Sequence, residues 1–176
     1  MVYSALLIAH SWIRWVVLVA AVVAVARSLL ARSGRRGWTP VDDRVARLFT
    51  SALDLQMLLG LLMYFYFSPL MSIVRQHLAT AMSDDAMRYW LVEHPFGMLI
   101  AIVLAHVGSA RIKKAADPRR KHRLALIFFG LALVAIAASI PWPGTSTGRP
   151  LLRVLPSQST GAAGQAAAPV NFERRA

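Results

Sequence analysis

The chain has 176 residues, of which 57% are hydrophobic and 16% are charged, and its mean hydropathy is +0.51. This composition is too apolar for a typical soluble domain and indicates an integral membrane protein of one domain. The net charge of +12 would suggest a nucleic-acid partner in a soluble protein. The absence of Cys excludes disulfides, thiolate metal sites and covalently attached c-type haem.

The first predicted membrane span covers residues 3–30 and includes an uninterrupted apolar stretch from Val16 to Ala26. It lacks the basic start of a signal peptide, and Arg14 falls inside the apolar region, so we expect the span to be retained. His10 and Arg14 are four residues apart and therefore lie on one face of this helix.

A basic loop over residues 31–47 is punctuated by Gly and Pro, and Thr39-Pro40 followed by two Asp residues predicts a helix start. The second span covers residues 48–67, carries Asp54 and closes on four consecutive aromatic residues. Such aromatic residues are typical of a membrane interface. Ser68-Pro69 ends this span.

Residues 70–89 are less apolar, but their apolar positions recur at roughly helical spacing and favour a short surface helix. The third span covers residues 90–110, and the fourth covers residues 124–140 and is stopped by Pro141-Trp142-Pro143. The predicted fold is an all-α, integral membrane four-helix bundle over residues 1–143.

The orientation follows from the distribution of Lys and Arg. Residues 27–47 contain six basic side chains and residues 111–123 contain seven, whereas residues 69–93 contain two. The positive-inside rule then makes loops 31–47 and 111–123 cytoplasmic, with both termini outside a bacterial cytoplasmic (inner) membrane. The basic charge therefore orients helices and meets anionic lipid headgroups, and no nucleic-acid partner is needed.

Residues 144–176 form a tail rich in Ala, Gly, Ser, Thr and Pro. Such a composition cannot bury enough apolar surface to order itself. We expect an extended extracytoplasmic tail that partner subunits hold on the outer face.

His10 and His94 both enter the membrane from the outer side and are expected at one depth. Two imidazoles on parallel helices at one level suit the axial sites of a b-type haem, or a quinone in the same slot. Arg14, one turn deeper, would bond a haem propionate. Alternatively, Arg14 and Glu93 form an interfacial ion pair and both histidines hydrogen-bond backbone or headgroups.

His106 lies about 18 Å from His94 along the helix axis, at the level of Asp54. A hydrogen bond between Asp54 and His106 is a simpler interpretation than a second metal ligand or a proton relay. His77 and His122 are expected in interfacial or loop positions. The sequence contains no HExxH, no GxSxG and no phosphate-binding Gly loop, so no catalytic motif indicates an enzyme.

Three short motifs, Ala9-His10-Ser11-x-x-Arg14-Trp15, Glu93-His94-x-x-Gly97-Met98 and Ile140-Pro141-Trp142-Pro143, resemble those of small bacterial four-helix membrane proteins described as cytochrome b-like. The resemblance covers roughly residues 3–143. It implies a haem b carrier in an electron-transfer membrane, with His10 and His94 at the matched positions.

Two functions remain open at this point. In the first, the chain is a non-catalytic accessory subunit that stabilises a respiratory or photosynthetic electron-transfer complex, and its tail docks on partner subunits. In the second, it is an electron-transfer protein that binds a b-type haem or a quinone between His10 and His94. No motif compels catalysis, so the sequence favours the accessory role slightly.

Overall fold

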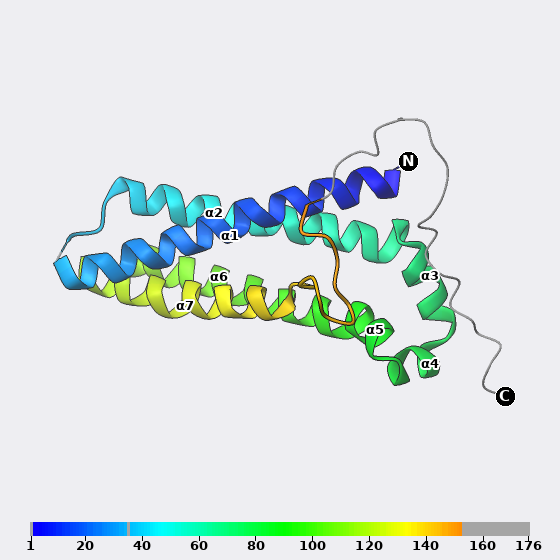
Figure 1. The fold of residues 1–176 in the computed structure, drawn as a ribbon. Helices are drawn as coiled ribbons and strands as arrows, with labels where there is room; N and C mark the ends of the chain where they lie inside the picture. The colour runs from blue at the N-terminus through cyan, green and yellow to red at the C-terminus, as the bar shows by residue number, and fades with distance from the viewer. Residues whose placement is uncertain (1, 35, 153–176) are drawn as a thin grey trace.

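The computed structural model describes residues 2–34 and 36–152. Within these ranges the chain is helical and contains no strand, as Figure 1 shows. Four helical segments are long and apolar enough to cross a membrane, namely Val2–Ala31, Pro40–Phe67, Asp85–Lys114 and Pro118–Ser139. The prediction of an all-helical chain with four spans is therefore confirmed. Of the predicted tail, residues 153–176 lie outside the described ranges.

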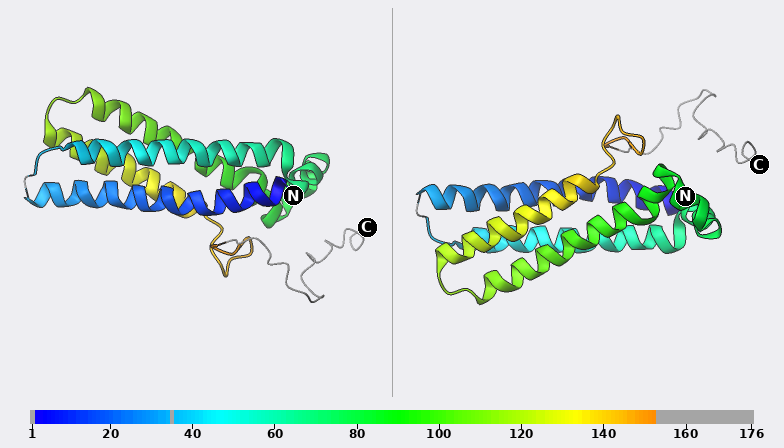
Figure 2. Two further views of the ribbon diagram at one scale, coloured as in Figure 1. Left: turned by 90° about the horizontal axis from the view of Figure 1, so that it is seen from above. Right: turned by 90° about the horizontal axis from the view of Figure 1, so that it is seen from below.

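The long helices are α1 (Val2–Gly34), α2 (Pro40–Leu62), α6 (His94–Lys114) and α7 (Pro118–Ser139). α1 packs against α2 and α7, and α6 packs against α7 and α2. Two layers result, with α1 beside α2 in one and α6 beside α7 in the other (Figure 2). In this arrangement α1 and α6 lie diagonally across the bundle.

Short elements connect α2 to α6 at the end of the bundle where the chain begins (Figure 1). The first is a π-helical turn, η1 (Met63–Phe67), followed by α3 (Pro69–Gln76), α4 (Leu78–Ser83) and α5 (Asp85–Arg88). A second π-helical turn, η2 (Tyr89–Glu93), leads into α6. The single surface helix expected over residues 70–89 is thus replaced by three short ones.

Helix α2 begins where its sequence predicts. Thr39 is its N-cap and Pro40 its first residue. The backbone N–H and the hydroxyl of Thr39 both donate to the Asp42 carboxylate, at 2.8 and 2.6 Å. An acidic residue at this position satisfies backbone groups left unpaired at a helix start and interacts favourably with the helix dipole.

Glycine lets α6 and α7 approach closely. A Cβ on Gly97 would lie 2.0 Å from the Ser139 hydroxyl oxygen, and a Cβ on Gly108 would lie 2.4 Å from Cβ of Phe128. Between these points the buried interface is built largely from alanine, and Phe129 is fully buried near its Gly108 end. Small residues at such contacts allow the van der Waals packing that holds membrane helices together.

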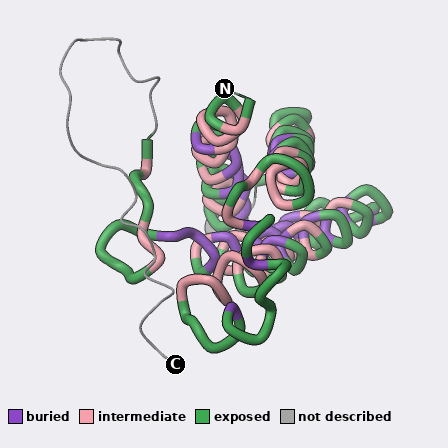
Figure 3. The backbone as a smooth tube through the Cα atoms, turned by 90° about the vertical axis from the view of Figure 1, so that its right-hand side faces the viewer, coloured by how far each residue is buried: buried purple, intermediate pink, exposed green. Residues whose placement is uncertain are grey.

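The buried positions face the middle of the bundle, and the outward positions are mostly large and apolar (Figure 3). At most one third of each span's most apolar window is buried within the chain. A surface of this kind suits a lipid environment, because exposed apolar side chains are stable against acyl chains and not against water.

Candidate functional site

His10 and His94 meet inside the bundle. His10 comes from α1 and His94 begins α6, and the centres of their imidazole rings lie 6.5 Å apart with the planes at 64°. Because α1 and α6 are diagonal, two side chains that meet between them meet in the interior. The structure thus brings together the two histidines that the sequence places at one level.

The His94 ring is oriented by a backbone carbonyl. Its Nδ1 lies 2.7 Å from the carbonyl oxygen of Ser139, and the Tyr89 hydroxyl donates to the same oxygen at 2.7 Å. A carbonyl only accepts, so Nδ1 carries the proton and the Nε2 of a neutral His94 keeps its lone pair. The rings of Tyr89 and Trp90 lie 5.9 and 5.7 Å from that of His94.

The His10 ring lies against Gly60 of α2, which has no side chain. A Cβ on Gly60 would lie 3.5 Å from Cε1 of His10, an ordinary contact distance. Among the described residues, His10 Nδ1 and Gln56 Oε1 are buried without a hydrogen-bond partner. Gln56 and Gly60 are four residues apart, so both lie on the same face of α2. Buried polar atoms of this kind are rare and point to a group that the protein chain itself does not supply.

Helix α7 stops at the level of this site. It has 22 residues against 33 in α1, which makes it about 16 Å shorter. Beyond Ser139 the chain leaves the helix and crosses to α1 as residues 140–152, here named the covering segment (Figure 1). α7 therefore does not continue alongside the first turns of α1, and the segment that follows it is not helical.

Three donors of α1 hold the covering segment at one atom. The Ser11 hydroxyl, the Arg14 guanidinium and the Trp15 indole N–H all donate to the backbone carbonyl of Leu151. The guanidinium of Arg149 also lies 5.2 Å from the centre of the Trp90 ring. The covering segment thus links α1 to the Trp90 ring, which lies beside His94.

The ion pair between Arg14 and Glu93, which the sequence offers as an alternative, is not among the contacts of the described residues. Arg88 Nε donates to Glu93 Oε1 at 2.8 Å, while Arg14 donates to the covering segment. The physical reason is the π-helical turn η2, in which residues five apart lie on one face, so that Arg88 and Glu93 are aligned.

The two histidines fit the axial positions of a haem. A metal bound to one nitrogen of each ring at about 2.0–2.1 Å would hold those nitrogens about 4 Å apart. Since a ring centre lies behind its nitrogen, two nitrogens turned toward each other at that spacing would be compatible with the 6.5 Å between the ring centres. In the described part of the chain, no group of three or more His, Cys, Asp or Glu could hold a metal ion. A porphyrin needs only the two axial ligands, because it supplies the other four nitrogens.

Asp54 and His106 form a second polar pair, on the other side of the bundle. His106 Nε2 lies 2.6 Å from Asp54 Oδ1, and the two side chains are 52% and 49% exposed. The hydrogen bond expected between them is thus present. Their exposure could not be read from the sequence, because it depends on how α2 and α6 are rotated.

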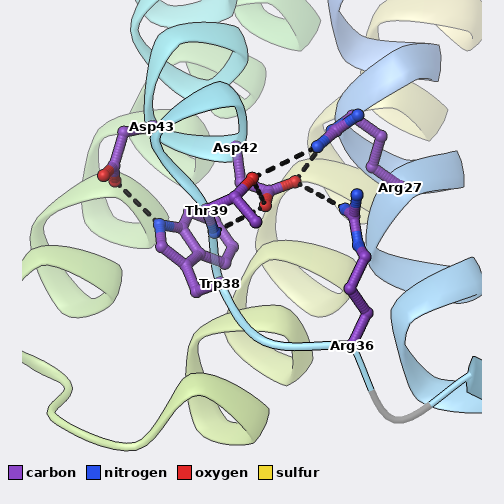
Figure 4. A network of polar contacts seen from close by, with 6 residues as sticks. All are labelled: Arg27, Arg36, Trp38, Thr39, Asp42 and Asp43. Carbon is purple, nitrogen blue, oxygen red and sulfur yellow. Dashed lines mark hydrogen bonds and ion pairs between the residues drawn. The ribbon is translucent and has the colours of Figure 1, made fainter.

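A polar network closes the opposite end of the bundle (Figure 4). The buried carboxylate of Asp42 accepts from Arg27 at 2.8 Å and from Arg36 at 3.1 Å, in addition to Thr39. Trp38 Nε1 donates to Asp43 at 2.8 Å. The helix start at Thr39 was predictable, but the ion pair between α1 and α2 joins residues 15 apart and left no local signal.

His122 is a further correction. The sequence suggests an interfacial or loop position, whereas the structure buries it to 2% exposure at the start of α7. Its ring lies 4.9 Å from that of Trp38, and within the described ranges neither ring nitrogen has a hydrogen-bond partner. His77 lies at the exposed C-terminus of α3, as expected.

No protein-family model, curated protein or solved structure matches this chain. A haem function suggested by the likeness of its short motifs to cytochrome b-like membrane proteins is therefore a proposal.

Proposed function

We propose that the chain is a membrane-embedded electron-transfer protein that holds a b-type haem between His10 and His94. The observation that supports this most is the approach of two imidazoles from diagonal helices, 6.5 Å between ring centres, inside the bundle. Histidine ligation from facing helices is a common way to hold haem in helical bundles.

The haem, when bound, supplies one-electron chemistry at its iron. The chain's own residues prepare the site. The Ser139 carbonyl holds the His94 ring in one tautomer and orientation, which presents Nε2 to the metal. The aromatic rings of Tyr89 and Trp90 beside His94 exclude water from the ligand.

Arg14 is the residue that would bind a propionate of the haem. With Ser11 and Trp15 it forms three converging donors, which in this structure meet the neutral carbonyl of Leu151. A carboxylate is a stronger acceptor for a guanidinium than an amide carbonyl. A haem propionate would therefore bind here in place of the Leu151 carbonyl, with the covering segment displaced.

Room for the macrocycle lies where α7 is missing. α7 ends at Ser139, and the covering segment that follows is not helical and is mostly exposed. Displacing such a segment is easier than separating packed helices. A quinone in the same slot would use the same imidazoles as hydrogen-bond partners.

The orientation is part of the proposal. Loops 31–47 and 111–123 are rich in Lys and Arg. This supports an orientation in a bacterial inner membrane with both loops on the cytoplasmic side and both termini outside. The histidine pair lies at the end of the bundle opposite to these loops, and so near the outer face. Electrons would be exchanged with partners on that side.

The alternative function is that of an accessory subunit in a larger membrane complex. It relies on a tail that docks on other subunits, and residues 153–176 lie outside the described ranges. The part of the tail that is described, up to Leu152, folds back on the chain's own α1. This contact favours a role in closing the histidine site.

The test is a reduced-minus-oxidised absorbance spectrum of the protein purified in mild detergent, with haem and iron assayed per chain. We expect a b-type spectrum with about one haem per chain, lost in both His10→Ala and His94→Ala. His77→Ala, which removes an exposed histidine, is the matched control and should keep the spectrum. A colourless, iron-free preparation, or a spectrum kept in both ligand variants, would overturn the haem assignment and favour the accessory role.

A further inference from the structure

The pair formed by Asp54 and His106 lies on the outer surface of the bundle. Both side chains are about half exposed, and they join α2 to α6, which pack against each other. Their neighbours along the two helices are exposed and apolar, and include Leu58 and Val103. We name this surface, defined by Asp54, Leu58, Val103, His106 and Ala110, the α2/α6 face.

The pair lies deep within the spans, so its exposure to lipid would be energetically costly. Asp54 is seven residues from Arg47 and His106 is five residues from Arg111, about 10 and 8 Å along the helix axes. A carboxylate on a short side chain cannot reach the headgroup region from there. Ionisable residues inside spans almost always face a bundle interior or a cavity, so this pair requires a cover other than lipid.

The outer surface between α1 and α2 does not have this requirement. A groove of about 370 Å³ between α1 and α2 is lined by Trp15, Val16, Val19, Ala20, Val23, Val45 and Leu48. Its accessible lining is wholly apolar, and acyl chains can fill it without leaving a polar group unpaired. The α2/α6 face therefore differs from the lipid-facing surface in chemistry as well as position.

The hydrogen-bonding atoms of the pair are self-complementary. Within the described part of the chain, His106 Nδ1 and Asp54 Oδ2 take part in no hydrogen bond. The contact between Nε2 and Oδ1 uses one nitrogen of the imidazole and one oxygen of the carboxyl group, and a proton on Nδ1 or on Oδ2 would let the second atom of each group pair with the other kind. The outward edge thus offers one donor beside one acceptor.

We propose that the α2/α6 face is the interface of a homodimer in the membrane. A twofold axis would place His106 Nδ1 of each copy against Asp54 Oδ2 of the other, so two equivalent interchain hydrogen bonds satisfy the unused atoms of both copies. Isologous interfaces require this self-complementary pairing. The small Ala110 and the aliphatic Val103, on either side of His106, then pack against their counterparts.

The absence of Cys from the chain allows a direct test. Single variants Val103→Cys and Ala110→Cys place one thiol on the α2/α6 face, and Val134→Cys places one on α7, where Val134 is 66% exposed. After oxidation in native membranes, we expect disulfide dimers of twice the chain mass from the first two variants and none from Val134→Cys.

A second measurement tests the polar pair itself. Asp54→Asn and His106→Leu should each lower the dimer association constant by about tenfold in detergent, because two equivalent interchain hydrogen bonds are lost. Leu131→Ala on α7 is the control and should leave association unchanged. Equal cross-linking at Val134, cross-links to a protein of different mass, or a monomer whose pair holds a lipid-soluble ligand would each overturn the dimer.

Discussion

The imidazole of His94 donates from Nδ1 to the backbone carbonyl of Ser139, across 2.7 Å, and so couples the start of α6 to the end of α7. The contact is possible because Gly97, one turn along α6, has no side chain where the two helices approach most closely. The packing of α6 against α7 and the orientation of His94, the proposed haem ligand, therefore depend on the same few residues.

Gly97→Ala should destabilise the bundle by about 1–3 kcal/mol, since the new Cβ would lie 2.0 Å from the Ser139 hydroxyl oxygen and force the helices apart. Thermal unfolding in detergent measures the loss. The double variant Gly97→Ala with Ser139→Ala should recover part of it, because the clashing oxygen is removed. No loss in the single variant would contradict the close approach of α6 and α7.

Asp42→Ala should lower the free energy of unfolding by about 1–3 kcal/mol, because it removes a buried carboxylate that accepts from Thr39 and from two partly exposed arginines. An SDS titration followed by circular dichroism measures the change. Asp43→Ala removes only the acceptor of Trp38 Nε1 and should have a smaller effect. Equal effects would show that the ion pairs add nothing.

His122→Leu should raise the midpoint of thermal unfolding. Both ring nitrogens of His122 are buried without a partner among the described residues, and an apolar side chain of similar size removes that penalty, which is about 1–3 kcal/mol. Leu124→Ala, which truncates a neighbouring apolar side chain, is the control and should lower the midpoint. A lower midpoint for His122→Leu would mean that the imidazole makes a stabilising interaction.

Arg14→Gln should lower the midpoint reduction potential of the proposed haem by an amount on the order of tens of mV. A positive charge beside the iron favours the reduced form, and its removal favours the oxidised form. A potentiometric titration in detergent tests this, with Arg119→Gln in the first turn of α7, at the opposite end of the bundle, as a matched control. An unchanged potential in Arg14→Gln would place the guanidinium away from the haem.

Local features of the sequence were sufficient to predict the helices. Hydropathy over about 20 residues identifies a span, and Thr39, Pro40 and Asp42 identify the start of α2 through contacts within one turn. The common level of His10 and His94 also follows from local information. The rise per residue is constant in a helix, so distance along the chain converts directly into depth.

Contacts between helices could not be predicted in this way, since they depend on how each helix is rotated about its axis and on where the neighbouring helix ends. The tertiary structure decided that Glu93 pairs with Arg88 through a π-helical turn and that His122 lies buried beside Trp38. It also decided that the covering segment returns to Arg14 and that Asp54 and His106 face outward. The sequence by itself determined the spans and the depths, because both arise from short-range physics. Only tertiary packing determined which polar groups meet.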